Sequence, residues 1–135
     1  MSYEEIPHTA DVKIRVHART LNALFSDACA ALMHVLYGSD RKGGYKKVIE
    51  ISANDHESLL RDFLSEVLFV SEVEGLVFAG ADIRMHGTGL TARLDGEPFD
   101  RERHSSGTEV KGISYSGLAI THDANGYMLD ILFDV

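Results

Sequence analysis

Two short segments near the ends of the chain carry the residues with the clearest chemical potential. His8-Thr9-Ala10-Asp11 lies between two extended stretches, and Phe133-Asp134-Val135 ends the sequence with a side-chain carboxylate next to the terminal carboxylate. The Asp11 carboxylate can cap local backbone N–H groups, which is the simpler use, or bind a hard cation. If the last strand pairs beside the first, three anionic groups converge and repel one another unless a cation or a proton joins them.

A second acidic group, Asp95, Glu97 and Asp100, lies in a long polar connection. It lacks the glycine and the closing glutamate of an EF-hand loop, so we interpret it as a solvated loop. The seven histidines show no i, i+4 pairing, which argues against a histidine-based transition-metal site. His8 and His104 stand beside other polar residues, although a lone histidine is more often a turn or surface residue than a ligand.

The sequence lacks the motifs of several enzyme classes. It has no P-loop, no G-x-G-x-x-G after a strand, no G-x-S-x-G and no H-E-x-x-H. Cys29 is the only cysteine, which rules out an internal disulfide and a cysteine-based zinc cage. It lies beside an apolar helical stripe, so we interpret it as a small core residue. We therefore expect a protein without a complete active site of its own.

Length and charge limit the function further. A chain of 135 residues suits one domain, residues 1–135, and its 44% hydrophobic and 25% charged residues are typical of a globular protein. The net charge of −8 disfavours strong direct binding to nucleic acid and is compatible with a basic protein partner or bound cations. No apolar run is long enough for a membrane span and no signal-peptide pattern is present, so we expect a cytoplasmic protein.

Two amphipathic helices are predicted in the first half of the chain. The first begins after Thr20, which has the character of an N-cap, and ends at Gly38. The second opens with Asn54-Asp55-His56-Glu57, a capping-box pattern in which the asparagine is the cap and the glutamate follows three residues later. Its apolar face is widened near its end by Phe69 and Val70.

The remaining segments read as strands separated by turn signals. Gly87-Thr88-Gly89 and Asn125-Gly126 each lie between two such segments, and Asn-Gly is a strong hairpin signal. The order is two strands, a helix, a strand, a helix and four strands, which predicts an α+β domain: a mainly antiparallel sheet with two amphipathic helices packed on one face. The predicted strands are residues 3–6, 12–19, 47–53, 76–86, 90–94, 110–121 and 127–133.

Several segments, taken together, resemble the archease family over nearly the whole chain. Gly112 stands where the family usually has alanine, and Ser116 where a histidine often follows the tyrosine. The segments that carry the resemblance are His8–Asp11, the helical segment Asp62–Phe69, Gly96–Asp100 with His104, the pre-hairpin segment Glu109–Tyr115, and Phe133–Val135.

The resemblance implies a small metal-binding accessory protein of tRNA splicing. Archeases assist the RNA-splicing ligase, which joins RNA ends with GTP and a divalent metal; they promote formation of the ligase–guanylate intermediate and permit multiple turnover. The metal site of the family carries over onto Asp11, Asp134 and Val135, with Ca²⁺ as the usual ion. His8, His104 and Lys111 are candidates for supporting that site or contacting the partner, although Lys111 can equally be an exposed lysine at a strand end.

Two other functions remain open on the sequence. A stand-alone hydrolase could use a carboxylate-bound metal to activate water, and it would turn over a phosphoester by itself. A chaperone or a modulator of a tRNA-modifying enzyme, also attributed to the family, would bind more than one client. Recovery of a single RNA ligase from a lysate would separate the ligase activator from both.

Overall fold

The computed structural model describes residues 3–6, 11–114 and 117–135. Residues 8–10 of the predicted turn, Tyr115 at the end of the pre-hairpin segment, and Ser116 after it lie outside the described residues. The described part forms, in chain order, β1 (Tyr3–Ile6), β2 (Val12–Ala18), α1 (Leu21–Tyr37), β3 (Tyr45–Ser52), α2 (His56–Glu74), β4 (Leu76–His86), β5 (Gly89–Pro98), β6 (Gly112–Ser114), β7 (Ile120–Asp123) and β8 (Gly126–Asp134).

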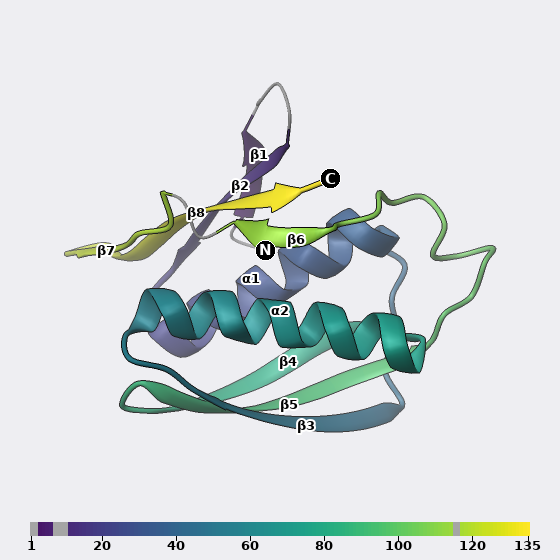
Figure 1. Ribbon diagram of the computed structural model, residues 1–135, viewed down its shortest axis with the longest axis horizontal. Helices are drawn as coiled ribbons and strands as arrows, with labels where there is room; N and C mark the ends of the chain where they lie inside the picture. Colours follow the sequence, from purple (N-terminus) through teal and green to yellow (C-terminus); the bar gives the residue numbers. More distant parts are fainter. Residues whose placement is uncertain (1–2, 7–10, 115–116) are drawn as a thin grey trace.

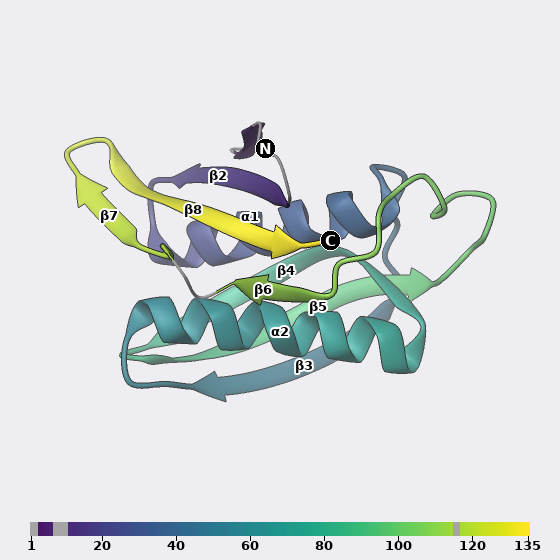
Figure 2. The ribbon, with the colours of Figure 1, turned by 45° about the horizontal axis from the view of Figure 1, so that its top comes forward.

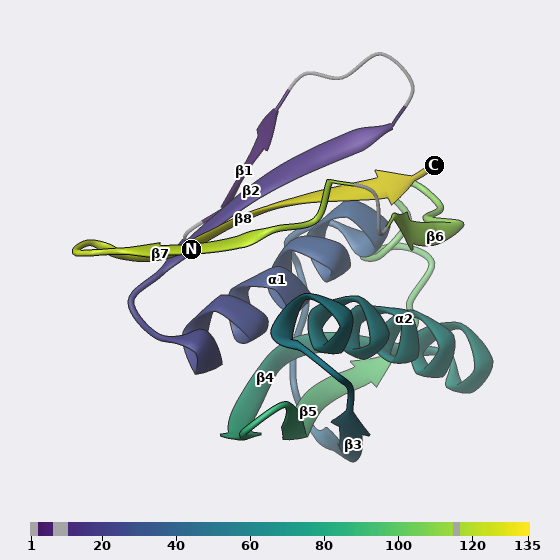
Figure 3. The same ribbon diagram turned by 60° about the vertical axis from the view of Figure 1, so that its left-hand side comes forward.

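The strands are divided between two antiparallel sheets, and both helices lie between the sheets (Figure 1). One sheet has the order β1-β2-β8-β6, with β7 also paired to β8, and the other has the order β3-β5-β4. Figure 3 shows the five-stranded sheet above the helices and the three-stranded sheet below them. The α+β class, the antiparallel pairing and the two helices are confirmed. The prediction of one sheet is refined to two, because each helix is apolar over an arc wide enough to pack against a sheet on either side.

Helix α1 has the ends that its sequence predicts. The Thr20 backbone is extended, and its Oγ1 accepts a hydrogen bond from the Ala23 N–H at 3.1 Å. Gly38 ends the helix with a φ of 83°, and its N–H donates to the His34 carbonyl at 2.9 Å. Cys29 is buried in the core as predicted, and burial raises the pKa of its thiol to about 12.

Helix α2 is capped one residue later than predicted. Asp55, not Asn54, has the extended cap conformation, and its Oδ1 accepts a hydrogen bond from the Ser58 N–H at 2.7 Å. With this frame Glu57 is the second helical residue, too early to complete a capping box. Its carboxylate instead accepts a hydrogen bond from the Ile120 N–H at 3.1 Å, which ties the start of α2 to β7.

The apolar face of α2 is narrower at its C-terminal end than the sequence suggests. Val70 is buried with the rest of the core stripe, but Phe69 is 59% exposed. Phe69 lies four residues after Ser65 and four before Val73, and positions with this spacing share one side of a helix. That side faces solvent, so the prediction that Phe69 widens the buried face is wrong.

Strand boundaries differ most from the predicted ones in two places, and by one or two residues elsewhere. The predicted strand 110–121 is two short strands, β6 and β7, which both pair with β8; Gly117, with a φ of 73°, lies between them. Strand β5 continues to Pro98, four residues past its predicted end, because Gly96 pairs with Tyr45 on one side and with Phe78 on the other. In the described residues no helix is long and apolar enough to cross a membrane.

Truncation of two phenylalanines tests which side of α2 faces the core and which faces solvent. Phe63 is fully buried, with its ring centroid 6.2 Å from that of Phe25, so Phe63→Ala should lower the free energy of unfolding by about 3–5 kcal/mol. Phe69→Ala should change it by no more than about 0.5 kcal/mol, because surface truncations do little. Urea unfolding of both variants measures the difference, and a large loss for Phe69→Ala would mean that this side of α2 is covered.

Candidate metal site on the open face of the five-stranded sheet

The pairing of β2 with β8 ends beside two of the predicted metal ligands, Asp11 and Asp134. Val12 pairs with Phe133, and the same register continued by one residue would set Asp11, which directly precedes β2, against Asp134. Phe133 is fully buried among the core residues. Side chains alternate along a strand, so the Asp134 carboxylate lies on the face turned away from the helices. It is β2, and not the first strand β1, that pairs with the last strand.

This placement suits two ligands of one cation. Residues directly opposite each other on antiparallel strands have Cβ atoms about 4.5–5.5 Å apart. Oxygen ligands of Ca²⁺ lie at about 2.3–2.6 Å from the ion, so two facing carboxylates can reach one ion. In the described residues no three His, Cys, Asp or Glu side chains form a metal-holding group. Val135, the third predicted ligand, follows Asp134 directly in the sequence.

Strand β6 forms the other side of the site. Gly112 pairs with Asp134, and the Lys111 N–H donates a hydrogen bond to the Asp134 carbonyl at 2.7 Å. A Cβ added at Gly112 would lie 3.7 Å from the Asp134 carboxylate, which is an ordinary contact, so alanine would fit here as well. The Lys111 side chain is exposed. Figure 2 shows β6 alongside the end of β8, near the C-terminus.

A third carboxylate on the same face is already neutralised. Asp130 lies opposite Arg15, whose Nε donates to Oδ1 at 2.8 Å and whose Nη2 donates to Oδ2 at 3.2 Å, with Lys13 Nζ 3.8 Å from Oδ2. The Arg15 guanidinium lowers the pKa of Asp130 below its usual value. Among the described residues no basic side chain forms an ion pair with Asp11 or Asp134. Asp130 is therefore not a candidate ligand, and Asp11 and Asp134 remain the candidate carboxylates on this sheet.

The competing acidic group is not a cation site. Glu97 accepts hydrogen bonds from Arg103 Nη1 at 2.9 Å and from the Lys42 N–H at 2.8 Å, and its side chain is only 12% exposed. Arg103 is the main cause that lowers the pKa of Glu97 to about 2. Asp95 forms an ion pair with Lys46 at 3.0 Å. The interpretation of this group as a solvated loop is therefore wrong for Glu97, which lies in a dense ion-pair network.

His104 has a structural position in that network. It is buried, and its Nδ1 accepts a hydrogen bond from the Asp100 N–H at 2.8 Å. Its other nitrogen, Nε2, must then carry the proton that it donates to Glu97 Oε2 at 3.1 Å. Both ring nitrogens are occupied, and the ring packs beside Tyr37 and Phe99. The imidazole is therefore not available as a metal ligand, and it anchors the connection between β5 and β6 instead.

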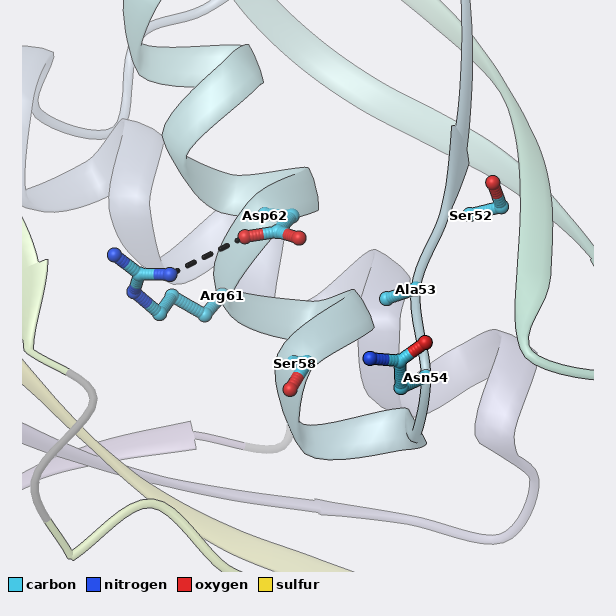
Figure 4. Close-up of a pocket in the computed structure, with 6 residues that line it drawn as sticks. All are labelled: Ser52, Ala53, Asn54, Ser58, Arg61 and Asp62. Atoms are coloured by element: carbon cyan, nitrogen blue, oxygen red, sulfur yellow. Dashed lines mark hydrogen bonds and ion pairs between the residues drawn. The ribbon is translucent and has the colours of Figure 1, made fainter.

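A polar hollow lies elsewhere, between the end of β3 and the start of α2 (Figure 4). Its one charged pair is Arg61 and Asp62, with Arg61 Nη1 3.4 Å from the carboxylate. No histidine or cysteine lines it, and its single carboxylate is paired, so the lining offers no set of metal ligands. The lining residues are Ser52, Ala53, Asn54, Ser58, Arg61 and Asp62.

Fold and site together describe a small α+β protein that presents an acidic strand end on an open sheet face. The model of the archease protein family (MTH1598/TM1083) matches residues 3–135, and the chain belongs to the archease family. Archeases are accessory proteins rather than catalytic enzymes.

Relatives agree with this assignment, and two solved structures share the fold. The chain is 32% identical to the archease of Methanosarcina barkeri over 98% of this chain and 95% of the relative, and 34% identical to that of Pyrococcus abyssi over 98% of each. The solution structure of Methanobacterium thermoautotrophicum protein 1598 has the same fold, with a TM-score of 0.82 at 23% identity over 99% of each chain. The crystal structure of an archease, possible chaperone, from Thermotoga maritima gives 0.71 at 19% identity, over 98% of this chain and 96% of that one.

The Glu97 network makes a prediction about pH. The pKa of Glu97 is about 2 in the folded protein against an ordinary 4.5, so its ion pairs stabilise the fold above about pH 4.5, and this stability is lost as the pH falls toward 2. Glu97→Gln should therefore lower the melting temperature at neutral pH, and the difference from wild type should shrink as the pH falls. Glu50→Gln, at an exposed position of β3, is the control and should change little. If Glu97→Gln lowers the melting temperature by the same amount at pH 7 and pH 2.5, the ion pairs of Glu97 are not the source of this stability.

Proposed function

We propose that this archease is a metal-binding activator of the GTP-dependent RNA-splicing ligase in tRNA splicing. In this role it promotes formation of the ligase–guanylate intermediate and allows the ligase to turn over repeatedly. The observation that supports the proposal is the β2–β8 register, in which the residues next to Asp11 and Asp134, Val12 and Phe133, are paired in a chain of this family. We expect it to act in the cytoplasm.

The proposed metal ligands are the carboxylates of Asp11, Asp134 and Val135. All are oxygen donors, the ligand type that Ca²⁺ and other hard divalent cations take. A bound cation would neutralise the repulsion between the carboxylates and offer coordination positions to further oxygen ligands. The chain's own contribution is to fix the backbone of Asp134, which pairs with Gly112 and whose carbonyl accepts a hydrogen bond from the Lys111 N–H.

The charge of the chain supports a protein partner over RNA. A net charge of −8 repels the phosphate backbone, whereas an enzyme that handles RNA needs a basic surface for that backbone. Acidic and basic surfaces attract each other and increase the association rate. An acidic accessory protein is therefore attracted to a basic ligase and does not itself bind the RNA strongly.

A second function, a chaperone or a modulator of a tRNA-modifying enzyme, is suggested by the name of the Thermotoga maritima relative, a possible chaperone. Such a protein would bind several clients and would raise their folding yield without changing guanylate transfer. The two functions are separated by mixing purified chain with purified ligase, GTP and labelled RNA ends.

In that assay the chain should increase the fraction of guanylylated ligase and should carry the ligase past one turnover. The chain with GTP and RNA alone should give no ligated product. Equal guanylylation and a single turnover with and without the chain would contradict the ligase-activator function. Recovery of several unrelated clients, with no effect on the ligase, would favour the chaperone.

Asp11→Ala tests the metal site separately from the ligase. Ca²⁺ should raise the melting temperature of the wild type, because a ligand bound only by the native state stabilises it. The variant should lose this shift, and without calcium it should be as stable as the wild type or slightly more stable, since one of two repelling carboxylates is removed. Thermal melts of both proteins, with Ca²⁺ and with chelator, measure the effect.

Asp82→Ala is the matched control, because Asp82 is an exposed carboxylate on β4 of the other sheet; it should keep the calcium shift. If Asp11 is a turn cap instead, Asp11→Ala would cost about 0.5–2 kcal/mol with or without calcium, as lost helix caps do. That outcome, together with a wild type that calcium does not stabilise, would end the metal-site proposal.

A further inference from the structure

Helix α2 exposes two large apolar side chains one turn apart. Phe69 is 59% exposed and Val73 is 66% exposed. Figure 1 shows the outer side of α2 with no other element passing in front of it. The solvent side of a helix in a globular protein normally carries polar residues, and scattered single exceptions need no explanation. An adjacent pair that includes an aromatic ring is a small contiguous patch, the kind of feature found at binding surfaces.

Acidic side chains flank this pair on both sides. With about 100° between successive helical residues, Glu66 lies about 60° to one side of Phe69 and Glu72 about 60° to the other. Neither glutamate forms an ion pair with another described residue. Helix α2 as a whole carries five acidic residues against one arginine. We call Glu66, Phe69, Glu72 and Val73 the α2 face.

Other exposed apolar residues adjoin the C-terminal end of the same helix. The Phe99 N–H donates to the carbonyl of Gly75, the C-cap of α2, at 2.8 Å, and Phe99 is 47% exposed. Lys47 on β3 forms an ion pair with Glu74 at 2.8 Å, and Tyr45, two residues earlier on the same side of β3, is 58% exposed. The apolar surface of the described residues is thus concentrated around this end of α2.

We propose that the α2 face is the surface on which the RNA ligase docks, through a basic segment of the ligase that also carries apolar side chains. The identity of the partner rests on the proposed function, whereas the location of the surface rests on the exposed pair and its acidic flanks. A basic segment can bury Phe69 and Val73 while it pairs with Glu66 and Glu72, the arrangement of an apolar interface centre with a charged rim. A second copy of this chain would bring the same acidic residues together in a protein of net charge −8, and like charges repel.

The position of the α2 face also relates docking to the candidate metal site. Strand β6 contacts α2 and pairs with β8. Figures 2 and 3 both place β6 between α2 and the end of β8. A partner seated on the α2 face therefore needs to cross only the short strand β6 to reach Asp134.

The test compares binding of variants to the purified RNA-splicing ligase by isothermal titration calorimetry. Phe69→Ala combined with Val73→Ala should raise the dissociation constant by about tenfold or more, as loss of central interface anchors does. Val48→Ala is the matched control for Val73→Ala, because Val48 is 57% exposed but lies on β3; it should bind like the wild type. Glu66→Lys with Glu72→Lys should also weaken binding and should reduce its dependence on salt.

The outcomes separate the two proposals. The calcium-dependent melting shift of the double alanine variant should equal that of the wild type, which excludes damage to the fold or to the metal site as the cause of weak binding. If the wild type binds the ligase and the double alanine variant binds equally well, the α2 face is not the docking surface and the proposed function stands. If the wild type does not bind, the proposed function fails. If sedimentation shows a wild-type dimer that the double variant lacks, the α2 face is a contact between copies of this chain and the inference is overturned.

Discussion

Strand β8 is the element on which the five-stranded sheet depends, because it pairs with β2, β6 and β7. Its inward side chains, Leu129, Ile131 and Phe133, are buried, and its outward ones include Asp130 and Asp134. A slip of one residue in register would carry both aspartates into the core and three apolar side chains out of it. The burial of the core therefore also determines which side chains meet at the open end of the sheet. The backbone of β8 at the candidate site is held in place by the hydrophobic packing of the other face of the sheet.

The long connection between β5 and β6 is held in a different way. It has few apolar residues to bury, and its position depends on charge: Arg103 joins Glu97, Asp100 and Asp40, while His104 closes the same network from the buried side. This network lies upstream of Lys111, whose backbone bonds to the carbonyl of Asp134. The sheet end is thus held by apolar packing on one side and by a polar anchor on the other.

Local signals in the sequence were reliable where one residue decides the structure. Thr20 and Gly38 mark the ends of α1, and the hairpin at residues 123–126 forms where Asn125-Gly126 predicts it. Gly126 is needed there for more than the turn. It pairs with Asp123, and a Cβ on Gly126 would lie 2.5 Å from the Ala18 carbonyl oxygen. The glycine is required for close approach to β2 as well as for the turn.

Features that depend on long-range packing could not be predicted from the sequence. Asn54 and Asp55 are equally good caps, and only the frame of the folded helix selects the second. Phe69 fits an apolar stripe by type, and its exposure follows from where the two sheets leave α2 uncovered. The convergence of Asp11 and Asp134 stays a prediction, although the pairing of β2 with β8 on which it depends is present. The partners of Glu97 come from two separate connections, Lys42 before β3 and Arg103 and His104 after β5, and no motif in the sequence announces that network.

The burial of Cys29 has a practical consequence. It is the only thiol in the chain, it lies in the core between the two sheets, and its raised pKa leaves almost no thiolate at neutral pH. A water-soluble thiol reagent can therefore react with the folded protein only when the core opens. The labelling rate of the natural sequence measures that opening directly, without an added probe. Any ligand that holds the sheets together will slow the reaction, so this one sulfur atom can report on binding events at distant surfaces.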